Sequence, residues 1–259
     1  MVTMFVGVPI AFSMGIVGFF GLVGMIGWDP SLAMVAGVTM ETGLDYGLSV
    51  VPLFILMGNF VTHAGLSDEL YAASNAWLGH RRGGLAMATV LACGGFSAVC
   101  GSSLATAATM TKVAMPSMRK YGYADSLATG VIAAGGTLGI LIPPSVILVL
   151  YGIMTQQDIG KLFAAGIIPG IIGIFGYMAT VWVVTAINPE LGPEAERVPM
   201  LQRFHLLKGI WGIVVLFIIV IGGIYLGVFT PTEAAGIGAS GAFMFALGRR
   251  RLSWYTLYL

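Results

Sequence analysis

Long uncharged stretches of the chain alternate with short charged ones. The first candidate span, residues 4–27, carries no charged side chain. Further apolar stretches run over residues 46–64 (after a shorter apolar piece, 32–38), 126–152, 162–187, 209–228 and, more weakly, 232–247. Because a bilayer-spanning helix needs about 20 mostly apolar residues, the pattern predicts an all-α, polytopic membrane protein.

The stretch 84–118 does not fit a simple span, because it is too long and is interrupted by CGSS at 100–103. Four basic clusters decide how it is arranged: Arg81/Arg82, Arg119/Lys120, Arg197/Arg203/Lys208 and Arg249/Arg250/Arg251. Short loops rich in Lys and Arg stay on the cytoplasmic side. A single crossing would separate the first two clusters, whereas a re-entrant helical hairpin places all four on the cytoplasmic side. We therefore predict a re-entrant hairpin over 84–118 and a cytoplasmic N-terminus. Two lysines, Lys112 and Lys161, do not fit this charge pattern.

A second interruption occurs at 135–145, where the sequence reads GGTLGILIPPS. Pro143 and Pro144 remove two backbone donors, so a broken helix is predicted, with carbonyls near Gly139, Ile140 and Ile142 left free. Free carbonyls and the hydroxyls of the CGSS turn would make a neutral oxygen cage that suits sodium, and discontinuous helices are where secondary transporters hold their ions. The helix that starts at the turn would favour an anion. Two ordinary kinked helices remain the alternative.

A third feature, Thr230-Pro231-Thr232-Glu233, has the arrangement of a capping box with proline at the first helical position. A helix start at the outer interface is the simpler interpretation. A substrate or ion contact by Glu233 is the alternative.

Composition narrows the function classes. Of the 259 residues, 58% are hydrophobic and 9% charged, and 38 are glycine; these values exclude a soluble globular enzyme, a disordered chain and a disulfide scaffold. Twelve Lys+Arg against eleven Asp+Glu give a net charge of +1, so no nucleic-acid partner is expected. Cys93 and Cys100 form no CxxC pair, and the three histidines are too scattered for a metal site. No catalytic motif is present, and neither enzymatic activity nor an organic cofactor is expected.

Four segments together resemble one known family. They are GVPIAFSMG (7–15), CGSSLATAATM (100–110), GGTLGILIPPS (135–145) and FTPTEAAGIGA (229–239). In this order they are similar to the large permease subunit of tripartite ATP-independent periplasmic (TRAP) transporters. The resemblance implies a sodium-coupled, elevator-type carrier in the bacterial inner membrane. Its implied partners are a small four-helix membrane subunit, a periplasmic binding protein, a carboxylate substrate of the C4-dicarboxylate or sialic-acid class, and the lipid bilayer.

The resemblance also implies a site. Sodium would be held by residues of the hairpin tip and the broken helix, acting mainly through carbonyls in the latter: Cys100 (through its carbonyl), Ser102, Ser103, Gly139, Ile142 and Pro144. Residues expected near the substrate are Gly101, Thr106, Thr137 and Ser145. No other metal is implied.

The implied organisation has four parts. Residues 1–83 form scaffold helices, 84–187 form a transport region with hairpin (84–118) and broken helix (126–152), 188–208 form a cytoplasmic linker, and 209–259 open a second, incomplete repeat. Since family members are longer and no second pair of breaks is found, a truncated carrier is expected. A non-transporting fragment or scaffold piece is the alternative.

Overall fold

The computed structural model describes residues 7–249, and the chain divides into two compact units, Met1–Leu48 and Ser49–Leu259. In the first unit, α2 (Ile10–Ile26) and α3 (Trp28–Gly43) are separated by Gly27, whose φ of 90° ends α2. The ring of Phe19 meets that of Trp28 edge-on at 5.3 Å. The short η1 (Tyr46–Ser49) then leads into the second unit.

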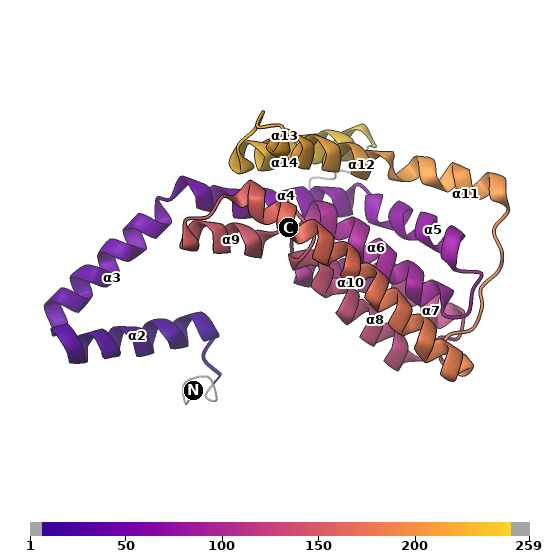
Figure 1. Cartoon of the computed structure of the whole chain (residues 1–259), viewed down its shortest axis with the longest axis horizontal. Helices are drawn as coiled ribbons and strands as arrows, with labels where there is room; N and C mark the ends of the chain where they lie inside the picture. Colours follow the sequence, from indigo (N-terminus) through magenta and orange to yellow (C-terminus); the bar gives the residue numbers. More distant parts are fainter. Residues whose placement is uncertain (1–6, 250–259) are drawn as a thin grey trace. The chain divides into compact units, whose positions relative to one another are not determined.

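The second unit consists of helices, most of them joined by short turns, with a longer connection between α10 and α11 (Figure 1). In chain order its elements are α4 (Val50–His63), α5 (Leu66–Leu78), α6 (Gly84–Cys100), α7 (Ser103–Lys120), α8 (Asp125–Thr137), η2 (Leu138–Ile140), α9 (Val146–Thr155), α10 (Ile159–Ile187), η3 (Pro189–Leu191), α11 (Met200–Leu207), η4 (Lys208–Ile210), α12 (Trp211–Phe217), the π-helical η5 (Ile218–Gly222), α13 (Gly223–Tyr225) and α14 (Pro231–Gly248). No strand occurs among residues 7–249. The all-α expectation is confirmed.

Helix α6 forms the centre of this unit. It packs against α4, α5, α7, α8 and α10, and most of its residues are buried. Its small residues permit this close packing: a Cβ added to Gly94 would lie 2.5 Å from Cδ1 of Ile174 on α10. Because α6 is surrounded by helices on most of its sides, its sequence is largely apolar rather than amphipathic.

A second layer pairs α14 with α4 (Figure 1). Alanines and glycines of α14 face α4, and a Cβ on Gly238 would lie 2.5 Å from Sδ of Met57. Phe60 and Phe243 add an edge-on ring contact at 5.3 Å. The helix starts as predicted, because Thr230 and Glu233 form a complete capping box.

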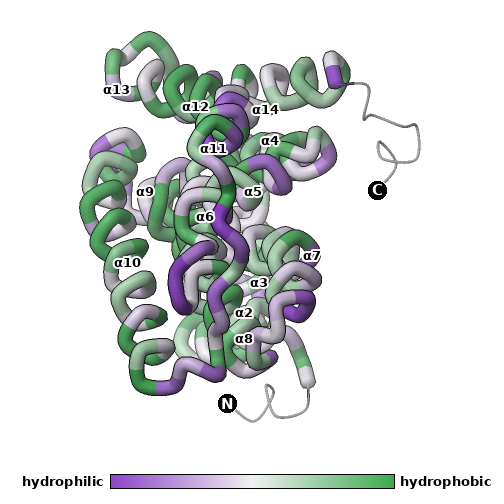
Figure 2. The backbone as a smooth tube through the Cα atoms, turned by 90° about the vertical axis from the view of Figure 1, so that its right-hand side faces the viewer, coloured by the Kyte–Doolittle hydropathy of each residue, from purple (hydrophilic) through white to green (hydrophobic). Residues whose placement is uncertain are grey.

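Three helical stretches of the described chain are long and apolar enough to cross a membrane: Tyr46–His63, Ile159–Ile187 and Met200–Tyr225. Shorter apolar helices occupy Ile10–Ile26, Gly84–Cys100 and Val146–Thr155. Figure 2 shows α10 as mostly hydrophobic and the connection that follows it as partly hydrophilic. This alternation agrees with the polytopic arrangement predicted from the sequence.

The chain turns back at Gly101, so that α6 and α7 form a helical hairpin. The hydroxyl oxygen of Tyr123, just after α7, accepts a hydrogen bond of 3.1 Å from the amide of Leu85 at the start of α6. Arg81/Arg82 and Arg119/Lys120 therefore lie at the same end of the unit, as the charge pattern predicted.

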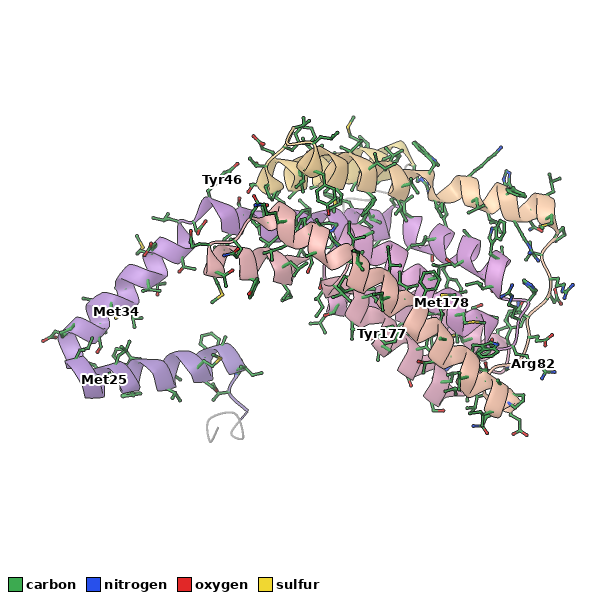
Figure 3. The ribbon with its side chains drawn as sticks, in the orientation of Figure 1. Met25, Met34, Tyr46, Arg82, Tyr177 and Met178 are labelled. Atoms are coloured by element: carbon green, nitrogen blue, oxygen red, sulfur yellow. The ribbon has the colours of Figure 1, made fainter. Side chains whose placement is uncertain are left out.

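The connection after α10 closes this same end. The carbonyl of Gly192 accepts from the amide of Gly83 (2.9 Å), and the carbonyl of Leu191 accepts from the amide of Ala124 (3.1 Å). Arg82 and Glu194 form an ion pair at 3.2 Å, and Figure 3 shows Arg82 beside this connection. Arg197 and Arg203 thus lie near Arg81, as the charge pattern predicted, but sequence reasoning did not anticipate the backbone hydrogen bonds that hold this connection in place.

Candidate functional site

The hairpin tip is built around a left-handed glycine. Helix α6 ends at Cys100, and Gly101 adopts a φ of 67°, which a side chain would oppose. Ser102 then caps α7: its hydroxyl oxygen accepts from the amide of Ala105 at 3.4 Å. The carbonyl of Ser102 accepts from both the amide and the hydroxyl of Thr106, at 3.0 and 2.8 Å. The GSS turn therefore ends one helix and starts another within two residues.

The second break lies at 141–145, between η2 and α9. It contains a cis peptide bond between Pro143 and Pro144. Ser145, fully buried, caps α9 by accepting from the amide of Leu148 at 3.3 Å. The predicted helix–break–helix is confirmed in this segment.

One sequence expectation at this break is wrong. The carbonyl of Ile140 is not free, because the hydroxyl of Ser145 donates to it at 2.6 Å. Pro144 has no amide hydrogen to donate to this carbonyl, and the hydroxyl of Ser145 takes the place of the missing donor. By contrast, the carbonyls of Ile142 and Pro144 accept no hydrogen bond from residues 7–249.

The two breaks meet each other through their backbones. The amide of Val146, the first residue of α9, donates to the carbonyl of Gly101 at 3.1 Å. A Cβ on Gly101 would lie 2.6 Å from the carbonyl oxygen of Pro144, and a Cβ on Gly139 would lie 2.6 Å from that of Ser102. Both glycines are therefore required by close approach. This contact unites the turn at 100–103 with residues 139–145, so the structure brings the six predicted sodium residues into one region.

This region also joins helix ends of opposite polarity. Helix α6 and η2 end there, while α7 and α9 begin there. The ends contribute carbonyl oxygens, and the two beginnings contribute partial positive charge from unpaired amides. The site can therefore attract a small cation through oxygens and an anion through helix N-termini. Within the described residues no cluster of His, Cys, Asp or Glu is arranged to hold a metal ion.

The residues predicted near the substrate do not all face the same way. Thr106 and Ser145 are buried within the site, and Gly101 forms its turn. The hydroxyl of Thr137 instead lies 2.9 Å from that of Tyr177 on α10, which Figure 3 labels. It also donates to the carbonyl of Ala134 on its own helix, α8, so this hydroxyl is engaged by α8 and α10 and not by the hairpin tip.

Sequence reasoning missed a close contact behind the tip. A Cβ on Gly58 of α4 would lie 2.9 Å from Sγ of Cys100 and 3.2 Å from its Cα. Cys100 is buried by this approach. A lone glycine in an apolar helix gives only a weak signal of such packing.

Sequence comparison identifies the family of this chain. Residues 1–258 match the family described as "Tripartite ATP-independent periplasmic transporter, DctM component". The chain belongs to this family. Its predicted membership in the TRAP large permeases is thereby confirmed, and together with the apolar helices it makes this TRAP permease chain a multi-pass membrane protein.

Individual TRAP relatives cover most of this chain. The C4-dicarboxylate TRAP transporter large permease protein DctM of Pseudomonas aeruginosa is 39% identical over 86% of the chain and 52% of the relative. The sialic acid TRAP transporter large permease protein SiaM of Vibrio cholerae is 34% identical over 91% and 54%. The isethionate TRAP transporter permease protein DctMQ of Oleidesulfovibrio alaskensis is 34% identical over 98% and 40%. The chain spans about half the length of the DctM and SiaM relatives.

Proposed function

We propose that this chain supplies one half of the moving carrier of a sodium-coupled TRAP transporter. A periplasmic binding protein would deliver a carboxylate substrate, and a small four-helix membrane subunit would complete the scaffold in the inner membrane. The observation that carries the proposal is the backbone contact between the hairpin tip and the broken helix, centred on Gly101 and Val146.

The oxygen atoms around this contact suit sodium as a bound ion. The carbonyls of Ile142 and Pro144 are unpaired within the described chain, and the hydroxyls of Ser102 and Ser103 lie on the neighbouring turn. All are neutral oxygens, which suit a hard monovalent cation that needs little ligand charge. The absence of acidic side chains from the turn and the break argues against a divalent ion, which favours carboxylates.

A carboxylate fits the same region through a different set of groups. Helices α7 and α9 both begin there, and helix N-termini stabilise anions. A sodium ion beside the substrate would lower the cost of moving its negative charge into a medium of low dielectric. Ion and substrate would therefore bind cooperatively.

The basic clusters suggest the orientation. Arg81/Arg82, Arg119/Lys120 and the connection after α10 share one end of the second unit. The positive-inside rule assigns that end to the cytoplasm and would place the tip of the hairpin within the membrane; the order of apolar stretches along the sequence would place the N-terminus inside.

Sodium binding can be tested on the chain itself. In lipid nanodiscs, sodium should raise the midpoint of thermal unfolding, and potassium at equal ionic strength should not. Ser102→Ala should reduce this sodium-specific shift. Thr111→Ala is the matched control, because its hydroxyl lies on the exposed side of α7 and donates to the carbonyl of Ala107. Equal shifts in both variants would contradict the assignment of sodium to the tip.

Transport requires a second experiment. Proteoliposomes holding the chain, a small subunit and a binding protein should take up radiolabelled C4-dicarboxylate or sialic acid only with inward sodium. Uptake that appears only when the second half of a relative's permease is added would assign this chain to half of the carrier. Sodium binding without uptake in either preparation would contradict the carrier proposal and favour the alternative, a non-transporting scaffold piece.

A further inference from the structure

A cavity of about 530 Å³ lies at the basic end of the second unit, away from the paired breaks. Its walls come from the turn before α6, from the last turns of α10, and from the connection after α10. His80, Arg81 and Arg82 line one side, and Glu194 and Arg197 line the other. Nothing in the proposed carrier mechanism uses this cavity.

The lining of the cavity carries an excess of positive charge. Arg82 pairs with Glu194 at 3.2 Å. Neither Arg81 nor Arg197 forms an ion pair with any residue of 7–249. The Nδ1 atom of His80 is buried and has no hydrogen-bond partner within the described chain. Two guanidinium groups without an ion-pair partner on the lining of one cavity are suited to an anion with several oxygens, such as a phosphate.

The charges around His80 are consistent with an anion that would complete this cavity. The pKa of His80 is lowered by partial desolvation and by the neighbouring guanidinium groups of Arg203, Arg197 and Arg81, against which Glu194 acts in the opposite direction. An anion placed among these groups would offset the repulsion. It would therefore raise the pKa of His80 toward its ordinary value.

A separate apolar groove of about 730 Å³ lies further along the same two helices, and its other wall is formed by α5 and by Leu207, Ile210 and Phe217. On α6, Met87 lines the cavity, and Leu91 and Gly94 line the groove. These positions are spaced by four and three residues, so they share one helix face. On α10, Trp182 of the cavity and Ile171 of the groove are eleven residues apart, which is about three helical turns, so they too share one helix face.

The exposed residues of α10 point to a membrane setting for both hollows. Trp182 is 62% exposed beside the basic cavity, and Ile171 is 48% exposed along the groove. Tryptophan is enriched where the hydrocarbon core meets the polar headgroups. The order along α10 is therefore headgroup level at Trp182 and acyl level at Ile171.

We propose that an anionic glycerophospholipid binds here, with its phosphate in the basic cavity and an acyl chain along the groove of α6 and α10. Basic pockets between membrane helices on the cytoplasmic side bind anionic headgroups. A free phosphate would use the cavity and leave the groove empty. A protein helix would bury the groove and leave the two unpaired arginines without a counter-charge. A lipid would place its phosphate against the arginines of the cavity and its acyl chain in the groove. Its phosphate would also bridge the connection after α10 and the turn before α6.

Native mass spectrometry of the full chain released from nanodiscs tests the headgroup part, with phosphatidylglycerol and phosphatidylcholine supplied in equal amounts. Retained phosphatidylglycerol is expected on the unchanged chain. Each arginine removed should weaken retention about 5-fold, so Arg81→Gln with Arg197→Gln should weaken it about 30-fold. Lys120→Gln removes the same charge at the same end, outside the cavity, and should retain the lipid.

The acyl part is tested with a pair of adjacent substitutions. Ile171→Trp fills the groove and should reduce retention, whereas Ile172→Trp places the same ring on a residue that is 65% exposed and does not line the groove. A histidine-resolved NMR titration should show the pKa of His80 rising when phosphatidylglycerol replaces phosphatidylcholine. Inorganic phosphate alone should neither displace the lipid nor reproduce this rise.

Four results would overturn the proposal. Equal retention of both lipids, or equal retention by the arginine variants and Lys120→Gln, would remove the headgroup site. Displacement of the lipid by millimolar phosphate would assign the cavity to a free anion. Unchanged retention in Ile171→Trp, with a protein segment cross-linking to Ile171 instead, would assign the groove to a protein partner.

Discussion

The amide nitrogen of Val146 donates to the carbonyl oxygen of Gly101 at 3.1 Å, so α9 begins on the turn that ends α6. This one hydrogen bond links two segments that are more than forty residues apart in the sequence. It holds two helix beginnings side by side, and the proposed substrate position depends on that pairing. Substitutions that separate the two turns should therefore affect stability and sodium binding together.

Gly101→Ala should be strongly destabilising for two reasons. The φ of 67° costs an L-residue about 1–2 kcal/mol, and the added Cβ would lie 2.6 Å from the Pro144 carbonyl, which cannot rotate away. Gly122→Ala is the control, since Gly122 has a φ of 75° and a Cβ added there would meet nothing within 4 Å. Thermal unfolding in nanodiscs should show a larger loss for Gly101→Ala, accompanied by loss of the sodium shift. Equal losses of thermal stability in the two variants would mean that the positive φ alone, and not the contact with Pro144, determines the effect.

Gly139→Ala tests the opposite side of the same contact. Its Cβ would lie 2.6 Å from the carbonyl oxygen of Ser102 and 2.9 Å from the amide of Ser103. Overpacking of this kind costs about 1–3 kcal/mol. Gly130→Ala, in open space on α8, should instead be neutral or stabilise by up to about 1 kcal/mol because alanine favours helix. A neutral Gly139→Ala would argue against backbone contact at the site.

Ser145→Ala removes two interactions at once. It deletes the cap of α9 and leaves the carbonyl of Ile140 without its donor. The expected cost is about 1–3 kcal/mol. Thr155→Ala, which removes an exposed hydroxyl later in α9, should change stability by less than about 0.5 kcal/mol. Chemical or thermal unfolding of both variants measures the difference, and similar values would show that Ser145 does not close the break.

The turn between α7 and α8 should respond to acid through Asp125. Arg119 donates to both oxygens of this carboxylate, at 2.9 and 3.1 Å, and lowers its pKa below 3.8. Since the folded pKa is below the unfolded one, the stabilisation is present above about pH 3.8 and is lost as the pH falls through the folded pKa. Carboxyl NMR should show the pKa of Asp125 rising in Arg119→Gln and changing little in Lys120→Gln. An unshifted Asp125 in Arg119→Gln would contradict the ion pair.

Local sequence rules predicted the elements of the site well. Gly101 and the prolines at 143 and 144 mark the two breaks, because glycine permits a left-handed turn and proline removes amide donors. The basic residues at 81–82 and 119–120 predicted that the chain returns to the same end, and Tyr123 bonded to Leu85 confirms it.

The remaining contacts depend on distant packing and have no local signal. Ser145 reaches Ile140 only because the intervening residues fold back. Gly58 is set against Cys100 by the position of α4, and Thr137 turns toward Tyr177 because Gly136 occupies the side of α8 that meets α7. A single sequence shows that these residues are small or polar, and the assembled helices determine what each one meets.

The connection after α10 links three other segments of the second unit by backbone hydrogen bonds. Through Leu191 and Gly192 it holds the start of α8 and the start of α6, and the amide of Ala195 donates to the carbonyl of Gly79 at 3.0 Å. Separating the start of α6 from the start of α8 would break the hydrogen bond to Gly192 or the one to Leu191. The end of α5, the start of α6 and the start of α8 are therefore tied to one another through a segment that lies more than fifty residues further along the chain.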